Sequence, residues 1–325
     1  MIVTKTPLRL SFFGGGSDIP QFYENEQGLC VSTTINSYIY LAVNKCVAEH
    51  LKVVYSELEL ENDIEKIKHD RVREILKHYR QTSNMEICSF SDIPSKGSGL
   101  GSSSTFTVGL INAVHRTLTN KEIDKKTLSE LACYIEIDKC GEPIGKQDQY
   151  AAAYGGLNAY WFNGKEVNVE PVDINFCTTM NLNSKLLCFN TGVNRQASSV
   201  LTEQVEKLKN KSNIVQTKLM VNFAKESLNL LQKGKLDEFG ELLGVAWEVK
   251  KKLSSNVSNS DIDEMYETAL KNGAIGGKIL GAGGGGYLMV YVPENKQNKV
   301  ISALSRYEQF NFNFENKGST VEMVS

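Results

Sequence analysis

Three glycines at alternate positions, followed by three serines, are the residues of this sequence best suited to chemistry. The run reads Pro94-Ser95-Lys96-Gly97-Ser98-Gly99-Leu100-Gly101-Ser102-Ser103-Ser104. Glycine lets a backbone bend sharply and expose its N–H groups, and the serines stand where a helix is predicted to begin. The free N–H groups and dipole of a helix start suit a phosphate, and a serine hydroxyl suits Mg²⁺. The alternative is a flexible loop with a serine helix cap.

A second candidate lies near the N-terminus, where a strand-like run delivers Arg9 and ends in a glycine turn. The turn reads Gly14-Gly15-Gly16-Ser17-Asp18. Its glycines let a ligand approach the backbone, and the hydroxyl and carboxylate that follow can bond sugar hydroxyls. The alternative is a plain turn in which Ser17 or Asp18 caps the next helix.

Two carboxylates, Asp148 and Glu136, lie in segments of small or apolar residues where a charge is unusual. Asp148 lies among small residues, in Gln147-Asp148-Gln149-Tyr150-Ala151-Ala152-Ala153, where a substrate could come close. It could then accept the proton of an attacking hydroxyl, and the alternative is an N-cap of a short alanine-rich helix. Glu136 lies in an apolar stretch of helix, where it could hold Mg²⁺ or face solvent.

A third glycine run, Gly281-Ala282-Gly283-Gly284-Gly285-Gly286, nominally matches the dinucleotide fingerprint. That fingerprint should open a helix, but Tyr287 to Val292 has the pattern of a strand. We therefore predict a glycine hairpin that faces a ligand across a gap between domains, with a plain strand connection as the alternative.

The elements that must position these residues mix strands and helices. The chain has 325 residues, 41% of them hydrophobic, which predicts two domains with a boundary near residues 181–185. Helices beside a mostly antiparallel sheet indicate an α+β fold. Strands are predicted at 39–44, 52–55, 85–90, 157–162, 274–280, 287–292 and 321–324. Helices are predicted at 70–79, 106–118, 128–138, 147–154, 200–208, 215–231, 236–253, 262–270 and 300–304.

Composition excludes several classes of protein. The net charge of −2 gives no general attraction to nucleic acid or to an anionic membrane. Seven cysteines without a Cys-x-x-Cys pair indicate free thiols in a reducing compartment. The start of the chain lacks the pattern of a signal peptide, and no stretch is long and apolar enough for a membrane span. We therefore expect a cytoplasmic protein, and the sequence leaves a homodimer open.

The three glycine motifs, in this order, resemble those of the GHMP kinase superfamily, which includes galactokinase and the homoserine, mevalonate and phosphomevalonate kinases. Residues 94–103 are similar to its ATP-binding motif, 281–286 to its third motif and 7–9 to its first. The resemblance covers nearly the whole chain. It implies an N-terminal domain like ribosomal protein S5 domain 2 over residues 1–183, and a ferredoxin-like C-terminal domain over 184–325.

The resemblance also implies roles for the residues named above. The backbone of Gly97 to Ser104 would wrap the phosphates of ATP, Ser103 and Glu136 would bind Mg²⁺, and Asp148 would be the catalytic base beside Arg9. The sugar pocket would be lined by Arg9, Gly15, Gly16, Ser17, Asp18, Asp148, Gly283 and Gly284.

Within the superfamily, segments 6–18, 28–36 and 141–156 look closest to the bacterial heptose kinases. This resemblance implies a kinase for the anomeric (C1) hydroxyl of D-glycero-α-D-manno-heptose 7-phosphate, whose 1,7-bisphosphate product feeds GDP-heptose synthesis for polysaccharide. A substrate that already carries a phosphate needs a second basic contact, for which Arg195, Lys146 and Lys5 are candidates. Two other functions stay open: a kinase for another sugar, such as fucose or galactose, and a non-catalytic sensor of sugar or nucleotide.

Overall fold

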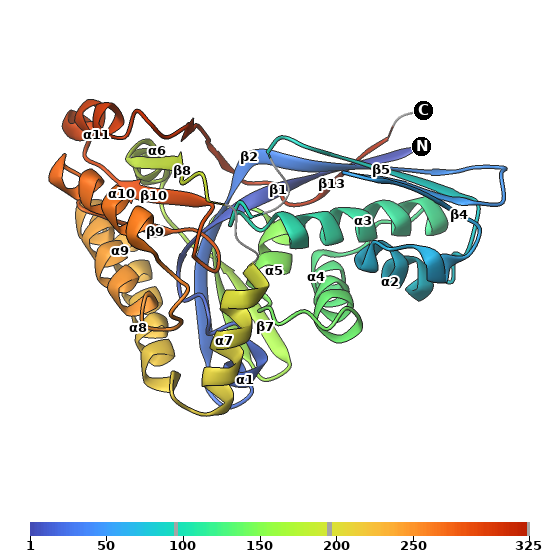
Figure 1. Ribbon diagram of the computed structural model, residues 1–325, viewed down its shortest axis with the longest axis horizontal. Helices are drawn as coiled ribbons and strands as arrows, with labels where there is room; N and C mark the ends of the chain where they lie inside the picture. Colours follow the sequence, from blue (N-terminus) through green and yellow to red (C-terminus); the bar gives the residue numbers. More distant parts are fainter. Residues whose placement is uncertain (94–96, 194–196, 324–325) are drawn as a thin grey trace.

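The computed structural model describes residues 1–93, 97–193 and 197–323. Two sheets and the helices packed on them make up the molecule (Figure 1). The prediction of an α+β class is confirmed, because strands and helices are mixed along the chain and most strand pairs are antiparallel. None of the described helices is both long and apolar enough to cross a membrane.

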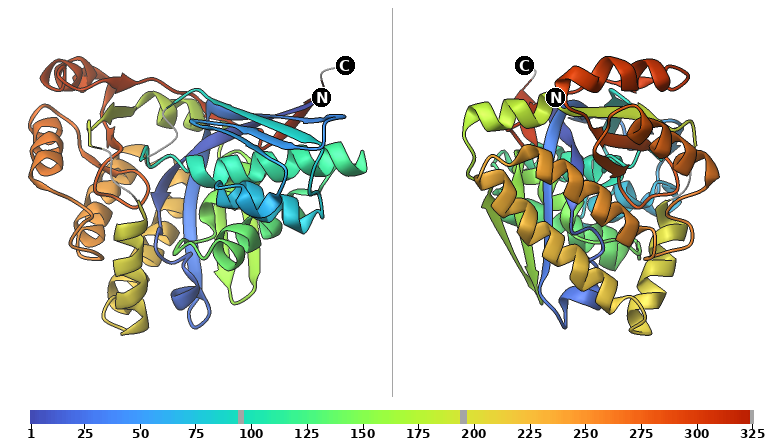
Figure 2. Two further views of the ribbon diagram at one scale, coloured as in Figure 1. Left: turned by 45° about the vertical axis from the view of Figure 1, so that its right-hand side comes forward. Right: turned by 90° about the vertical axis from the view of Figure 1, so that its left-hand side faces the viewer.

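The larger sheet has nine strands in the order β13-β1-β2-β5-β3-β4, with β12 and β6 also pairing with β2, and β7 pairing with β6. Their bounds are β1 Ile2–Phe13, β2 Gly28–Lys45, β3 Leu51–Val54, β4 Leu58–Glu61, β5 Met85–Ser91, β6 Asn158–Asn163, β7 Glu166–Pro171, β12 Phe314–Glu315 and β13 Thr320–Met323. The pair β3–β5 is parallel, and every other pair in this sheet is antiparallel. Because β13 pairs with the start of β1, the first residues of the chain and its last described strand lie side by side (Figure 2).

Helices cover one face of this sheet, and α3 packs directly on β1 and β2. The helices of this half are α1 Pro20–Tyr23, α2 Asp70–His78, α3 Ser102–Thr119, α4 Lys125–Cys133 and α5 Gln147–Tyr154, with a 3₁₀ turn at Ile64–Lys66. The helix α4 continues as a π-helix over Tyr134–Lys139, which carries Glu136. Such widened turns are rare and are frequent at functional sites.

The smaller sheet is antiparallel, with strand order β11-β8-β10-β9. Its strands are β8 Leu186–Asn190, β9 Gly276–Ile279, β10 Tyr287–Tyr291 and β11 Gln309–Phe310. The helices of this half are α6 Phe176–Ser184, α7 Ala197–Lys209, α8 Ile214–Gln232, α9 Leu236–Lys250, α10 Ser260–Lys271 and α11 Gln297–Ala303, with a 3₁₀ turn at Glu294–Lys296. Helix α9 packs on β9, and α8 reaches across to β1 and β2, so the two halves share one core.

The predicted elements are confirmed in type, with shifted ends and several omissions. The strand pattern missed β4, β7, β8, β11, β12 and the first part of β2 before residue 39, and the helix pattern missed α1 and α6. The missed elements other than β2 are short or polar, so they carry little periodic signal. The last predicted strand is present as β13, and Val324 lies outside the described residues.

The boundary predicted between residues 183 and 184 stays a proposal. The smaller sheet begins at Leu186, yet β12 and β13, at the far end of the chain, pair with β2 and β1 of the larger sheet.

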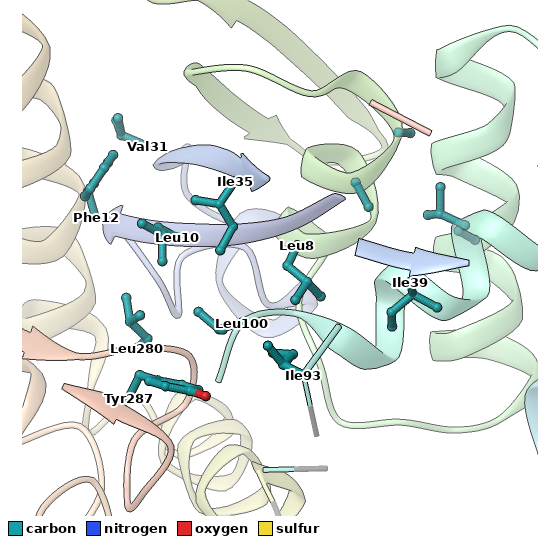
Figure 3. Packing of buried hydrophobic residues seen from close by; sticks show 14 of the residues in the cluster. Leu8, Leu10, Phe12, Val31, Ile35, Ile39, Ile93, Leu100, Leu280 and Tyr287 are labelled. Atoms are coloured by element: carbon teal, nitrogen blue, oxygen red, sulfur yellow. The ribbon is translucent and has the colours of Figure 1, made fainter. Parts of the chain in front are cut away.

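Strand β1 runs through the centre of the core, and it is buried from Thr6 to Phe13. Its register with β2 shifts twice, between Pro7 and Leu8 and between Ser11 and Phe13, so Arg9 lies between two irregularities. Such bulges re-aim side chains and are common beside active sites. Figure 3 shows Leu100 between side chains of β1 and two residues of the second half, Leu280, which directly follows β9, and Tyr287, the first residue of β10.

Candidate active site

The loop before α3 is held by β1 on one side and by the third glycine run on the other. These contacts argue against the alternative of a flexible loop. Leu100 is fully buried, which stabilises the anchored loop by about 2 kcal/mol. The main chain of the loop also bonds β1, since the Arg9 N–H donates to the carbonyl of Leu100 over 3.0 Å. Pro94, Ser95 and Lys96, the first residues of the predicted motif, lie outside the described residues.

Glycine is required where this loop meets the third glycine run, because the two backbones touch. Gly99 has φ +74°, and a Cβ there would lie 2.5 Å from the carbonyl oxygen of Leu280. A Cβ on Gly281 would lie 2.7 Å from the Cα of Gly99. The third run therefore supports the loop by backbone contact, which explains why positions 281 and 286 are glycine, since a Cβ on Gly286 would lie 2.5 Å from the carbonyl oxygen of Ser98.

Arg9 and Asp148 form a two-pronged ion pair in the wall of the cleft. Arg9 Nε donates to Asp148 Oδ1 over 2.7 Å, and Arg9 Nη2 donates to Oδ2 over 2.6 Å. Arg9 Nη1 donates to the carbonyl of Gly99 over 2.6 Å. The Arg9 side chain is 5% exposed and that of Asp148 is 26% exposed, so the carboxylate faces the cleft and the guanidinium holds it from behind. Paired forks of this kind fix the orientation of a carboxylate.

Asp18 caps α5, the function that the alternative interpretation gave to Asp148. The Gln147 N–H donates to Asp18 Oδ2 over 3.2 Å, and the Gly16 N–H donates to Oδ1 over 2.9 Å. Burial, and then the negative charge of Asp148, raise the pKa of the Asp18 carboxyl. Because Asp18 supplies the cap, the side chain of Asp148 is available to the cleft.

These groups line a cavity of about 520 Å³ between the two halves, a size that suits a small-molecule ligand. Its lining includes six of the eight predicted phosphate-loop residues: Ser98, Gly99, Gly101, Ser102, Ser103 and Ser104. It also includes Arg9, Gly15, Gly16, Asp18 and Asp148 from the predicted sugar pocket. Helix α3 begins at this wall with Ser102, and the N–H groups of its first turn have no partner within the helix.

A second cavity of about 470 Å³ adjoins the first and shares Arg71, Ser102 and Ser103 with it. The rings of His69 and Phe106 stack in its wall with centroids 4.8 Å apart, and Tyr55 meets His69 edge-on. Burial lowers the pKa of His69, which favours the neutral ring. A flat base could lie among these rings with its phosphates directed to the glycine loop. Sequence reasoning missed this cavity because its residues come from five separated segments.

Glu136 is fully buried, and four side chains donate to its carboxylate. The donors are Arg71 Nε at 2.8 Å, Ser104 Oγ at 2.7 Å, Thr107 Oγ1 at 2.9 Å and Gln149 Nε2 at 2.6 Å. Arg71 also donates to Glu142 over 2.9 Å, and both of these side chains line the cleft. Serine hydroxyls and carboxylates are the hard oxygen ligands that Mg²⁺ prefers. Ser103 is exposed to the cleft, whereas a cation on Glu136 would share that carboxylate with Arg71 or displace it.

Two lysines that sequence reasoning missed complete the wall of the cleft. Lys250, at the end of α9, and Lys278, in β9, are 4% and 3% exposed. Lys278 donates to the carbonyls of Ser11 and Phe12 over 2.7 and 2.9 Å. A signal was available for Lys278, because a lysine inside a predicted buried strand is uncommon.

Several predicted binding residues lie elsewhere. The Ser17 hydroxyl is buried and donates to the carbonyl of Gly14 over 2.8 Å, so it shapes the glycine turn. Gly283 and Gly284 pack on Val257, outside the described lining of the cleft. Gly97 and Leu100 belong to the loop but lie on the side that faces away from the described lining of the cleft.

Of the three basic residues proposed for a substrate phosphate, Lys146 and Lys5 lie over the rings of Tyr23 and Tyr38, at 4.5 and 4.0 Å. Neither is part of the described lining of the cleft. Arg195 lies outside the described residues.

Comparison with known proteins places these features in context. The family described as GHMP kinases N terminal domain matches residues 65–156, and the family described as GHMP kinases C terminal matches residues 227–309. The D-glycero-alpha-D-manno-heptose 7-phosphate kinase of Campylobacter jejuni is 31% identical, over 98% of this chain and 97% of its own.

Two solved structures are similar over almost the whole chain. A D-glycero-D-manno-heptose 1-phosphate kinase from Bacteroides thetaiotaomicron has a TM-score of 0.83 at 26% identity and covers 100% of both chains. A putative sugar kinase from Campylobacter jejuni has a TM-score of 0.77 at 30% identity and covers 99% of this chain and 98% of its own.

The contact between the two glycine runs yields a prediction for Gly99→Ala. The new methyl group must push Leu280 away, so both the free energy of unfolding and the affinity for ATP should fall. Gly164→Ala is the matched control, because Gly164 also has a positive φ (+57°) but no atom lies within 4 Å of the place that its methyl group would take. We expect the control to lose only about 1 kcal/mol of stability. Equal losses in the two variants, measured by chemical denaturation, would contradict the account.

Proposed function

This chain belongs to the GHMP kinases, and from that premise we propose that it transfers the γ-phosphoryl group of ATP to the anomeric (C1) hydroxyl of D-glycero-α-D-manno-heptose 7-phosphate. The family consists of ATP-dependent kinases, and the fold predicted from the glycine motifs is confirmed by the relatives. The position of the Asp148 carboxylate, in the wall of the cleft beside the glycine loop, carries the proposal.

The choice of sugar rests on similarity along the whole chain. The relatives that match almost the whole chain include proteins named as heptose phosphate kinases, at 31% and 26% identity. Their names place a phosphate at different positions of the heptose, so they support a phosphorylated heptose as the substrate class. The phosphorylated position and the acceptor hydroxyl belong to the proposal.

The chain's own residues supply the positioning and the charge that phosphoryl transfer needs. The acceptor hydroxyl lies against Asp148, its oxygen bonds the γ-phosphorus as the bond to ADP breaks, and its proton passes to the carboxylate. Asp148 Oδ1 accepts from Arg9 and also from Gln147 Nε2 over 3.1 Å, whereas Oδ2 accepts only from Arg9 among the described contacts and keeps a lone pair. The ion pair therefore orients Asp148 and leaves Oδ2 able to accept a proton. The guanidinium carries five N–H groups, of which three are used by Asp148 and Gly99. The others can stabilise charge on the phosphoryl oxygens.

The loop and the adjoining cavity would hold the nucleotide. The base would lie among the rings of Tyr55, His69 and Phe106, and the triphosphate would pass Ser102 and Ser103 on its way to Asp148. We propose Ser103 and Glu136 as the residues that hold Mg²⁺. The guanidinium of Arg71 would then move away from the Glu136 carboxylate. The ion would neutralise charge on the β- and γ-phosphates when bound.

Asp148→Asn tests the role of the carboxylate. The amide keeps the shape of the side chain but cannot take up a proton, so kcat should fall by more than about 100-fold. The affinity for ATP, measured by calorimetry, should change little, because the nucleotide contacts lie on the loop and in the aromatic cavity. Turnover close to that of the wild type would remove Asp148 from the role of base.

A panel of acceptors tests the substrate. We expect kcat/KM to be highest for D-glycero-α-D-manno-heptose 7-phosphate and much lower for mannose, fucose and galactose. ³¹P NMR of the product should show a phosphate on C1. Faster turnover of fucose or galactose would favour a kinase for that sugar, and absence of turnover with every sugar would favour a sensor.

A further inference from the structure

Lys250 and Lys278 are buried lysines that have no described counter-ion for their charged form. Within the described residues, neither ammonium forms an ion pair with a carboxylate. Their partners are carbonyl oxygens: Ser11 and Phe12 for Lys278, and Ile279 and Gly281 for Lys250. Burying an unpaired charge costs several kcal/mol, so buried charges are normally paired. An ammonium has three N–H groups, which leaves one on each lysine for another acceptor.

The surroundings increase this excess of positive charge. Arg9 lies near both lysines and already pairs with Asp148, and Asp18 is held by backbone N–H groups. Burial and the charge of Arg9 lower the pKa of Lys250 to about 7, although Asp18 and Asp148 act in the opposite direction. Burial, Lys250 and Arg9 lower the pKa of Lys278 well below its ordinary value. A bound anion would stabilise the charged form of both groups.

We propose that Lys250 and Lys278 form a phosphoryl-binding subsite in the cleft, which holds a phosphate dianion between the two halves of the molecule. Both lysines line the same cavity as Asp148 and the glycine loop. They come from α9 and β9, whereas the loop and Asp148 come from the first half of the chain. This inference deepens the proposed function and rests on it, because it requires a phosphorylated ligand in this cleft.

The positions of the two lysines suggest two sources for the phosphate. Lys250 bonds Gly281, which touches Gly99 of the phosphate loop, so it lies on the side of the transferring group. Lys278 bonds the carbonyls of Ser11 and Phe12, which lead into the glycine turn of the predicted sugar pocket, so it lies on the side of the acceptor. The shared chemistry is a phosphoryl group with anionic oxygens directed at buried ammonium groups.

Inorganic phosphate is the direct probe, with Lys250→Met and Lys278→Met as the variants. Methionine has a similar length without the charge, and Lys252→Met, at an exposed position two residues from Lys250, is the matched control. Phosphate should raise the melting temperature of the wild type and of the control above that in chloride at equal ionic strength. The two buried-site variants should lose this shift, which is measured for each protein against its own melting temperature in chloride, because methionine also removes the donor from the bonded carbonyls.

Two results would overturn the proposal. One is a phosphate-dependent shift that persists in both buried-site variants, and the other is a wild type without such a shift. A drop in the melting temperature of Lys250→Met in chloride, with the phosphate shift intact, would show that this lysine only ties α9 to the glycine run. Because this assay needs no acceptor, its result stands whether or not the heptose phosphate proves to be the substrate.

Kinetics with two acceptors separates the sources of the phosphate. If a lysine binds the phosphate of the sugar, its variant should lose about 10- to 100-fold in kcat/KM for heptose 7-phosphate and little for plain heptose. If it binds the transferring group, kcat should fall by a similar factor with both acceptors. Either pattern supports the subsite, and unchanged kinetics with both acceptors in both variants would refute it.

Discussion

The guanidinium of Arg9 joins three parts of the chain that are distant in sequence. It holds both oxygens of Asp148 on α5, it donates to the carbonyl of Gly99 in the phosphate loop, and its own backbone belongs to β1. Because the side chain is almost completely buried, these bonds are protected from water and fix the distance from the carboxylate to the loop. The cleft depends on this interaction, since a base and a phosphate cradle are useful only at a fixed separation.

The glycine motifs act together for a related reason. The loop before α3 approaches the run at 281–286 so closely that side chains would not fit between them. The segment between β9 and β10 therefore meets Gly99 backbone to backbone, while Leu100 packs on Leu280 and Tyr287. Lys250 of α9 and Lys278 of β9 line the same cleft as Asp148. The separation of the motifs along the chain thus reflects a contact between the two halves of the molecule.

The sequence predicted those parts of the site that are carried by contiguous motifs. The loop at 97–104, the turn at 14–16, and Asp148 stand in short runs with a distinct composition, and the structure brings them to one cavity. Local patterns could not show that Asp18 caps a helix 129 residues later in the chain, which frees Asp148 from that role. They also could not show that the Ser17 hydroxyl bonds the backbone, or that Glu136 is enclosed by Arg71 and three neutral donors. Contacts between distant segments decide these features, and a single sequence gives no sign of them.

A crystal structure with a non-hydrolysable ATP analogue and heptose 7-phosphate would test the central claim most directly. The account predicts the base among the rings of Tyr55, His69 and Phe106, the γ-phosphate between the glycine loop and Lys250, and the C1 hydroxyl within hydrogen-bond distance of Asp148. A sugar bound with C1 away from Asp148, or a nucleotide bound outside the aromatic cavity, would contradict it.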